Sequence, residues 1–214
     1  MPASPVSVIL LTLMLPLLAN VAPPTGAQGV GSTTRSEVAA ALRQGGYVIY
    51  LRHTATDQTA LDSDRASLRP CKTERNLSDA GRQQARELGR AFKALEIPVG
   101  KVLVSSSCRA VDTGQLAFGR TERSDALYDA IESTAGERER RNTDLRRLLA
   151  TPPAPRTNTV LVSHHANLKD ATGIWPKQEG TVEVFRPDPA RKFEHVAEVS
   201  LEKWSQWARA HSHL

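Results

Sequence analysis

The sequence predicts an α/β fold, a three-layer α/β/α sandwich around a mostly parallel central sheet. Three short apolar runs, at residues 47–51, 101–106 and 159–163, have the length of buried strands, and helical patterns lie between them. Strands that alternate with helices are typical of a layered sheet whose strands run parallel. The 214 residues contain no internal repeat and no low-complexity linker, so residues 28–214 are expected to form a single domain.

Residues 1–27 differ in composition from the rest of the chain and are expected to be a signal peptide. An apolar core from about Val6 to Leu18 is followed by small residues and turn formers, although no Lys or Arg precedes it. Pro16 interrupts this core, which is shorter than the ~20 residues of a membrane span. We expect cleavage near Ala27, export to the periplasm or the medium, and no membrane span afterwards. An uncleaved anchor is the alternative.

The first predicted helix and strand come directly after this segment. Thr34 and Glu37 have the spacing of a capping box, and Gly45 and Gly46 would end the short helix between them and strand 47–51.

A loop and a second helix are predicted next. Residues 52–75 show no clear periodicity and are rich in Thr, Asp and Ser, which is typical of a functional loop. Ser78 is a candidate N-cap for a helix over 79–97. Its apolar residues recur at helical spacing, namely Ala85, Leu88, Phe92 and Leu95. Pro98–Gly100 would then turn the chain into strand 101–106.

The next stretch repeats the alternation of helix and strand. Residues 108–119 are predicted to form a helix closed by Gly119, and residues 124–130 a brief strand. Thr134 and Glu137 form a second capping box before a highly charged helix, whose inward face would carry Leu145, Leu148 and Leu149.

The last third of the chain begins with a proline-rich surface connection, 151–158. The third apolar run follows and stops at His164. Residues 181–187 and 193–204 show alternation that predicts a terminal hairpin. A C-terminal helix is expected to pack onto the core through two tryptophans, Trp204 and Trp207.

Charge and composition restrict the kind of partner. The formal net charge of +5 favours an anionic partner. Only 5% of the residues are aromatic, and no basic patch is interleaved with rings on which bases stack, so nucleic acid is not expected. A phosphorylated small molecule or an envelope phosphate ester fits this composition.

Each of the three predicted strands is followed by basic side chains. Arg52 and His53 follow the first, Arg109 the second and His164 the third. Because the carboxyl ends of parallel strands meet at one edge of the sheet, these side chains are expected to converge there. Guanidinium groups match phosphate oxygens in a bidentate geometry, so this set predicts a site for a tetrahedral anion.

The same segments resemble the motifs of a known family. Residues 51–56, LRHTAT, are similar to the Arg-His-Gly-x-Thr signature of the histidine phosphatase superfamily, which has the phosphoglycerate-mutase-like fold. SSSCRAVDTG at 105–114 resembles that family's Ser-x-x-x-Arg-Ala-x-x-Thr motif, and LVSHHANL at 161–168 resembles its third. RNLSDAGRQQARELG at 75–89 is similar to its Leu-Thr-x-x-Gly-x-x-Gln-Ala stretch. The matches run in order over most of the chain.

The resemblance implies an exported phosphatase that hydrolyses phosphomonoesters. His53 would be the nucleophile that forms a phosphohistidine, and Arg52, Arg109 and His164 would hold the phosphoryl oxygens. No metal and no cofactor are expected. The alternative is a catalytically weak or inactive module of the same fold that binds phosphate or interacts with the envelope; a mutase is a third option.

Three further residues are candidates for contact with the substrate. Thr54 stands where the family usually has glycine and brings a hydroxyl close to the nucleophile. Thr56 matches the threonine that ends the motif and would either donate to phosphate or cap the loop. His165 would either contact the substrate or lie on the solvent-facing rim.

The proton donor for the leaving oxygen is left with three candidates. A carboxyl group must lie within hydrogen-bond reach of that oxygen. Asp129 stands at the position that the family resemblance favours, and Glu132 follows one helical turn later. Glu179, before the late strand, is the third candidate.

The chain has two cysteines, Cys71 and Cys108. In an oxidising compartment they are expected to form a disulfide, and two separate buried thiols are the alternative. A Cys-x5-Arg phosphate loop would need arginine where Leu77 and Gly114 stand, so neither cysteine is predicted to be a nucleophile.

Overall fold

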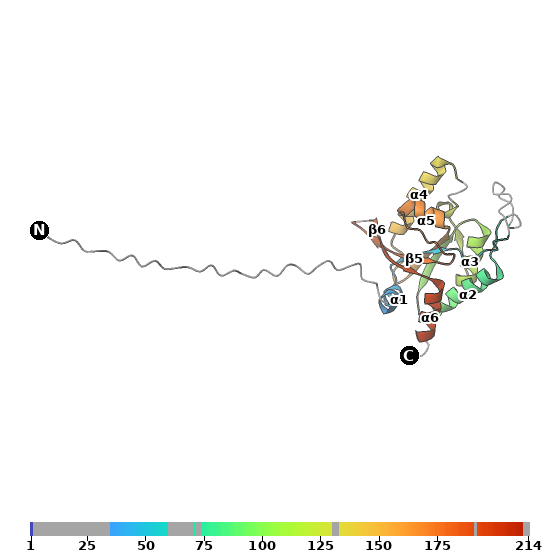
Figure 1. Ribbon diagram of the computed structural model, residues 1–214, viewed down its shortest axis with the longest axis horizontal. Coiled ribbons are helices and arrows are strands. Elements are labelled where there is room, and N and C mark those ends of the chain that lie inside the picture. Colours follow the sequence, from blue (N-terminus) through green and yellow to red (C-terminus); the bar gives the residue numbers. More distant parts are fainter. Residues whose placement is uncertain (2–34, 60–70, 72–73, 130–132, 191, 212–214) are drawn as a thin grey trace. The chain divides into compact units, whose positions relative to one another are not determined.

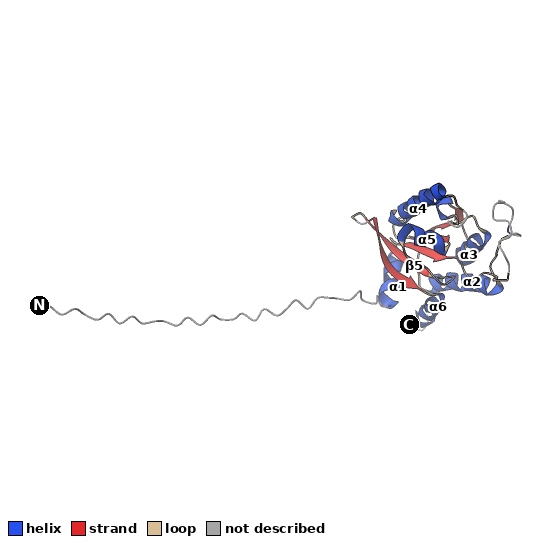
Figure 2. Ribbon diagram, turned by 45° about the horizontal axis from the view of Figure 1, so that its top comes forward, coloured by secondary structure: helices blue, strands red, loops and turns tan. Residues whose placement is uncertain are grey.

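A six-stranded mixed sheet forms the centre of the fold in this computed structural model, which describes residues 1, 35–59, 71, 74–129, 133–190 and 192–211 (Figures 1 and 2). The strands lie in the order β3-β2-β4-β1-β5-β6. Their bounds are β1 Val48–Arg52, β2 Val99–Val104, β3 Glu122–Arg123, β4 Asn158–Ser163, β5 Val182–Asp188 and β6 Lys192–Val199. Strands β1 to β4 pair in parallel, whereas β5 and β6 form an antiparallel hairpin beside β1. The predicted α/β sandwich with a mostly parallel sheet is confirmed.

Helices cover both faces of this sheet. They are α1 Arg35–Gln44, α2 Asp79–Ala94, α3 Cys108–Phe118, α4 Ala135–Ala150, α5 His165–Thr172 and α6 Leu201–His211. Figure 1 shows α4 and α5 on one side of the sheet and α1, α2 and α6 on the other. Among the described helices, none has the length and apolar character that crossing a membrane requires.

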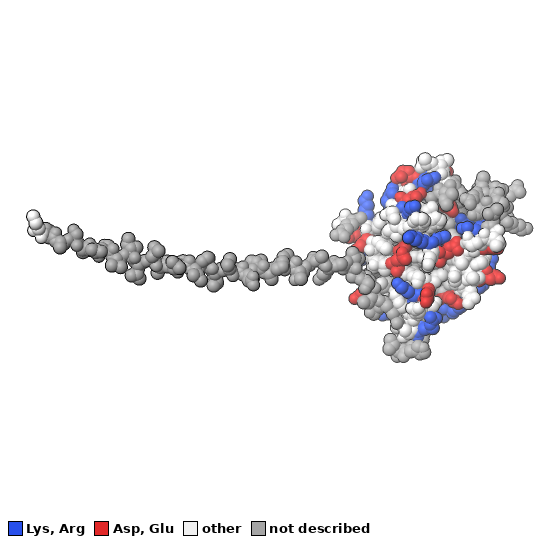
Figure 3. Space-filling model, viewed as in Figure 1, with Lys and Arg blue, Asp and Glu red and all other residues white. Residues whose placement is uncertain are grey.

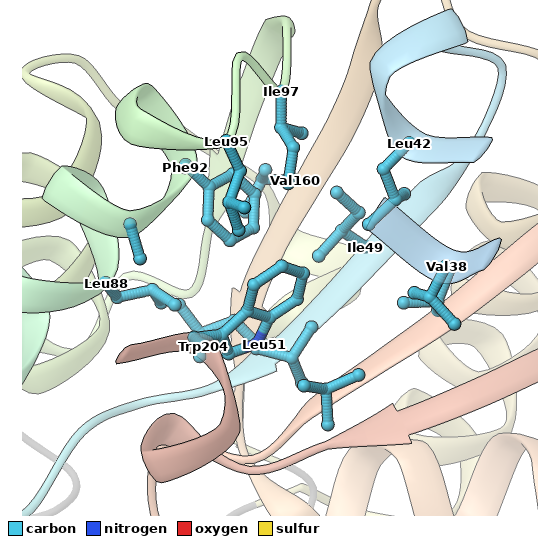
Figure 4. Close-up of a cluster of buried hydrophobic side chains, with 14 of the residues drawn as sticks. Val38, Leu42, Ile49, Leu51, Leu88, Phe92, Leu95, Ile97, Val160 and Trp204 are labelled. Atoms are coloured by element: carbon cyan, nitrogen blue, oxygen red, sulfur yellow. The ribbon is translucent and has the colours of Figure 1, made fainter. Parts of the chain in front are cut away.

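The core has two halves, because successive strand residues point to opposite faces. Ile49 and Leu51 pack towards α1, α2 and α6, where Trp204 and Phe92 fill the space between helix and sheet (Figure 4). Tyr50, with Val48, lies in the other half, below α4 and α5. A strand that is buried on both faces reads as a continuous apolar run, which explains the first strand's sequence.

The helix ends follow the predicted local chemistry. The Ser78 hydroxyl accepts a hydrogen bond from the Gly81 N–H at 3.1 Å and caps α2. Thr134 and Glu137 form the predicted capping box of α4. Gly119 ends α3 with φ of 71°, a left-handed conformation that glycine adopts without strain. Thr34, the predicted cap of α1, lies outside the described residues.

Several elements differ from the prediction. Strand β2 spans Val99–Val104 rather than 101–106, and β6 ends at Val199, so residues 201–204 of the predicted second hairpin strand belong to α6. The brief strand β3 precedes residues 124–130, which were predicted to be extended, and a 3-10 helix, η2, spans Asp125–Leu127. This helix buries Leu127 completely under α4, so burial of one side chain decides the local conformation. Helix α2 ends at Ala94 rather than 97, because Glu96 turns the chain with φ of 56°. Helix α5, directly after the third apolar run, was not predicted.

Two features of the prediction concern the chain as a whole. Residues 33–214 form one unit, and of the preceding residues 1–32 only Met1 is described, so the expected signal peptide lies outside the described residues. On the face seen in Figure 3, basic and acidic side chains are interspersed. The net charge of +5 is therefore not gathered in one patch on that face.

Candidate active site

The end of β1 places Arg52 and His53 at the carboxyl edge of the sheet. The backbone N–H of His53 donates to the Ser163 carbonyl on β4 at 3.0 Å. The His53 carbonyl accepts from the N–H of Gly180, in the loop before β5, at 2.9 Å. The side chain is only 2% exposed. His53 is thus fixed from both neighbouring strands.

The His53 ring has one nitrogen free for nucleophilic attack. Its Nδ1 lies 3.0 Å from the Thr54 carbonyl oxygen. Because a carbonyl only accepts, Nδ1 must carry the hydrogen, which leaves the lone pair on Nε2. Burial, followed by the neighbouring His164 ring and nearby guanidinium groups, lowers the pKa of His53 well below 6.5. The neutral, nucleophilic form of the ring is therefore favoured.

His164 follows the last residue of β4 and faces His53. The two ring centroids are 5.3 Å apart, in an edge-on arrangement. The Nε2 atom of His164 lies 3.0 Å from the Ser105 hydroxyl and 3.3 Å from the Ser107 hydroxyl. Burial, and next the charge of Arg109, lowers the pKa of His164 well below 6.5. Two neutral imidazoles therefore face each other at the carboxyl edge of the sheet.

Arg109 enters from the first turn of α3 and pairs with Asp129. Its Nη2 donates to Asp129 Oδ2 at 3.0 Å, and both side chains are largely buried. The same carboxylate oxygen lies 3.7 Å from Nδ1 of His164. Asp129 thus joins the guanidinium of α3 to the histidine of β4.

Arg52 is held on the opposite side of His53 by the loop before β5. Its Nη1 donates to the carbonyls of Pro176, at 3.2 Å, and of Lys177. Its Nη2 lies 3.7 Å from Oε1 of Glu179. The buried Nε of Arg52 has no hydrogen-bond partner within the described part of the chain, which is uncommon for a buried donor.

Glu179 is the second carboxylate of the site. Its Oε2 accepts from the Thr56 N–H at 3.0 Å, and its Oε1 accepts from the Thr56 hydroxyl at 2.8 Å. Oε1 also lies 4.0 Å from Nδ1 of His53. Of the three candidate proton donors, Asp129 and Glu179 both lie at the site, and Glu132 lies outside the described residues.

The three candidate substrate contacts have different surroundings. Thr54 is fully buried, and its hydroxyl lies 3.2 Å from the Thr113 hydroxyl of α3. Thr56 holds Glu179, as described above. His165 lies at the start of α5, where its ring stacks on Trp175 with centroids 6.3 Å apart. Substrate contact by these residues stays a prediction.

Three residues of the site had no role assigned from the sequence. Ser105 begins the Ser-x-x-x-Arg motif, so the motif itself was the signal that locates it. Ser107 and Arg75 carried no such signal. Arg75 lies with Nη2 4.0 Å from Oε1 of Glu179.

A disulfide joins Cys71 to Cys108, with Cα atoms 5.5 Å apart. The Glu74 carboxylate accepts from the Cys108 N–H at 2.8 Å, so it binds the first turn of α3 next to Arg109. The end of the long loop is thereby tied to the helix that carries a site arginine. Within the described residues, no group of three or more His, Cys, Asp or Glu is arranged to hold a metal ion.

Residues 48–148 match the family model of the histidine phosphatase superfamily, branch 1. This match agrees with the family that the motifs indicated. A comparison with curated proteins found no match.

Solved structures show the same fold. A phosphoserine phosphatase from Entamoeba histolytica is 16% identical, with 74% of this chain and 98% of that chain covered and a TM-score of 0.50. A mycobacterial glucosyl-3-phosphoglycerate phosphatase is 14% identical, with 72% of this chain and 98% of that chain covered and a TM-score of 0.50. At these identities the likeness concerns the fold alone.

The matched segment ends before His164. It contains Arg52, His53 and Arg109, but the second histidine comes from a later strand. The position of His164 opposite His53 therefore rests on the parallel pairing of β4 with β1.

Proposed function

We propose that this protein is a phosphatase that hydrolyses phosphomonoesters through a phosphohistidine on His53. The observation that carries the proposal is the pair of buried imidazoles, His53 and His164, with centroids 5.3 Å apart. Arg52 and Arg109 lie near enough to lower the pKa of both rings through their charge. A neutral nucleophile between fixed cations suits attack on a phosphate dianion.

The reaction proceeds in two transfers. Nε2 of His53 attacks phosphorus, the ester P–O bond breaks, and the leaving oxygen takes a proton from a carboxyl group. Water then attacks the phosphohistidine and gives a proton back to the carboxylate, the P–N bond breaks, and inorganic phosphate leaves with His53 and the carboxyl group restored. Arg52, Arg109 and His164 stabilise the charge on the equatorial oxygens during both transfers.

Asp129 is our choice of proton donor. A phosphate dianion on Arg109 competes with the Asp129 carboxylate for that guanidinium. It also places negative oxygens beside the carboxylate, and a like charge favours the protonated form of a carboxyl group. Glu179 instead accepts two hydrogen bonds from Thr56, so we assign it to holding Thr56 and Arg52 in place.

The test uses the purified protein with 4-nitrophenyl phosphate and a metal chelator. Wild type should release phosphate, and His53→Ala should lose at least roughly a thousandfold in kcat, because the covalent route depends on that nitrogen. His211→Ala, on α6, is the matched histidine control and should keep wild-type activity. Activity that survives in His53→Ala would contradict the phosphohistidine route.

The second candidate function is phosphate binding without turnover. The 3.0 Å pair between Arg109 and Asp129 favours it, because this carboxylate is already engaged by a guanidinium and not by a leaving group. Under this function, calorimetry would show phosphate binding to wild type, and no phosphomonoester would be hydrolysed.

We also infer that the protein is exported, to the periplasm or the medium. The apolar core and small residues of 1–27 support this inference, and a disulfide is compatible with an oxidising compartment. N-terminal sequencing of the protein recovered from the periplasm or medium should give a start near Gln28. A chain that stays in the cytoplasm with its full N-terminus would contradict export.

A further inference from the structure

The side chains beside His165 are more exposed than His53 and His164 and include an aromatic ring and a cation. His165 is partly buried and stacks on Trp175, which is 46% exposed. The Lys169 ammonium lies 4.2 Å from the centre of the Trp175 ring. Trp175 directly precedes Pro176 and Lys177, whose carbonyls bind Arg52. A solvent-facing ring and a cation thus border the site of phosphoryl transfer.

Arg75 adds a second half-exposed cation to this border. Its side chain is 30% exposed, and it lies 4.0 Å from Glu179, which Arg52 also approaches. Its backbone is well fixed: Leu77 pairs with Thr56, and the neighbouring Glu74 binds the start of α3. Arg75 therefore lies beside Glu179, in the segment before α2, whereas Lys169 belongs to α5.

The charges of Arg52, Lys169 and Arg75 all act on the His165 ring. Burial lowers the pKa of His165, and the charges of Arg52, Lys169 and Arg75 act in the same direction. Asp129 opposes them, and Glu179 lies between Arg52 and Arg75. We assign Arg52 and Arg109 to the transferred phosphoryl group. Among the described residues whose charge acts on His165, Lys169 and Arg75 are two further cations.

We propose that Arg75, Lys169, His165 and Trp175 form a second anion subsite, which we call the mouth subsite. It binds a further acidic group, phosphate or carboxylate, on the part of the substrate that leaves. The preferred substrates are then phosphomonoesters whose alcohol carries a second acidic group, preferably on a ring that contacts Trp175. This inference rests on the proposed function for the identity of the transferred group.

The experiment compares three probes that differ in one substituent: phenyl phosphate, 4-carboxyphenyl phosphate and 1,4-phenylene bisphosphate. Binding to His53→Ala protein is measured by calorimetry, so that the result does not depend on turnover. Hydrogen bonds to a charged group typically change affinity by about tenfold or more. The two doubly acidic probes should therefore bind about tenfold more tightly than phenyl phosphate, and the stronger of the two identifies the preferred acidic group.

The variants add Arg75→Gln and Lys169→Met to that protein, with Arg90→Gln on α2 as the matched control, since Arg90 is an exposed arginine of another element. The double variant should reduce the tenfold preference to within about twofold. The control should keep it. Equal binding of all three probes to the unmodified subsite would overturn the proposal, as would a double variant that weakens all three probes equally, because that result places Arg75 on the transferred phosphate.

The same probes separate this proposal from the proposed function. In wild type, kcat/KM should show the same preference for the doubly acidic probes. If wild type hydrolyses none of the three while the binding preference is present, the mouth subsite stands and the phosphatase function fails. If all three are hydrolysed at equal kcat/KM and bound equally, the phosphatase function stands and the mouth subsite fails.

Discussion

A histidine attacks phosphorus only when its ring is neutral and the correct nitrogen carries the lone pair. In this chain, burial keeps His53 neutral, and the Thr54 carbonyl selects the nitrogen. His164, which has the same burial, is instead bound through Nε2 by two serine hydroxyls. The two imidazoles are therefore chemically distinct although they face each other, and only His53 offers Nε2 without a hydroxyl beside it among the contacts described here.

The role of Asp129 predicts a dependence on the leaving group. Asp129→Asn should lower kcat for an alkyl phosphate such as glycerol 2-phosphate by roughly a hundredfold, because general acid catalysis typically contributes 10²–10⁴-fold. Hydrolysis of 4-nitrophenyl phosphate should fall much less, since nitrophenolate leaves without a proton. Steady-state kcat for both substrates checks this, with Asp112→Asn on α3 as control. Equal losses on both substrates would show that Asp129 only positions Arg109.

The sequence was sufficient for those site residues that follow the ends of strands. Two apolar runs end at these residues: Arg52 and His53 come at the end of β1, and His164 directly follows β4. Because the two strands pair in parallel, the three residues lie at the same edge of the sheet. Arg75 and Ser107 could not be assigned, because their places depend on how loops return to the site. The contact between Thr54 and Thr113 could not be foreseen for a related reason, since it depends on how α3 packs against the loop after β1.

At the scale of elements, the fold depends on close approach between helices and the loops that carry the site. An added Cβ at Gly81 of α2 would lie 1.8 Å from the Ala55 carbonyl oxygen, within the motif that contains His53. An added Cβ at Gly89, further along the same helix, would lie 2.1 Å from the Ala117 carbonyl oxygen of α3. Helix α2 therefore rests on both the nucleophile loop and the helix of Arg109, and its glycines allow that contact.

Such contacts were not predictable from periodicity, which explains the boundaries that differ. Periodicity located α2, whereas Gly119 at its end located α3 and a capping box located α4. Periodicity did not locate α5, because this helix has only 8 residues and its inward apolar residues are Leu168 and Ala171. In β3 only two residues pair, so the extended segment is too short to leave a pattern.

The packing of α2 on α3 predicts opposite effects of the same substitution. Gly89→Ala should lower the free energy of unfolding by about 1–3 kcal/mol, because overpacking costs that much where backbone cannot move away. Gly136→Ala in α4 meets nothing within 4 Å and should raise it by about 0.5–1 kcal/mol through higher helix propensity. Urea unfolding of both variants checks this. A Gly89→Ala protein as stable as Gly136→Ala would mean that the two helices separate freely.

The disulfide predicts a large effect on the unfolded chain. Its cysteines are 37 residues apart, and the loop-entropy relation gives about 4 kcal/mol for a loop of that length. Replacing Cys71 and Cys108 by alanine should therefore lower the free energy of unfolding by about that amount, as measured by urea unfolding. Wild type unfolded in a reducing agent should match the double variant. If the variant and the oxidised protein unfold at the same urea concentration, the loop does not constrain the unfolded state.

At the scale of the whole molecule, the stability of the fold depends on what the site binds. Three guanidinium groups, of Arg52, Arg75 and Arg109, and two carboxylates, of Asp129 and Glu179, lie at the site, so arginines outnumber carboxylates among its described residues. A bound phosphate would add negative charge there. Any ligand that binds only the folded state stabilises it, so phosphate should raise the melting temperature as its concentration exceeds its Kd.

The buried histidines also predict how stability depends on pH. Both folded-state pKa values lie below the unfolded value of 6.5, so below that pH the unfolded chain binds protons that the folded chain does not. The free energy of unfolding should therefore fall as pH drops from about 6.5, by up to about 1.4 kcal/mol per pH unit for each histidine.

Burial raises the pKa of Glu183, which acts in the opposite direction, since its folded form gains stability as pH falls. That contribution is common to wild type and His164→Asn, so the difference between the two proteins isolates one histidine. Urea unfolding at pH 7.5 and 5.5 should show wild type losing up to about 1.4 kcal/mol more than His164→Asn per pH unit below 6.5. Equal losses would mean that His164 is protonated in the folded protein, which would remove the neutral second imidazole from the proposed site.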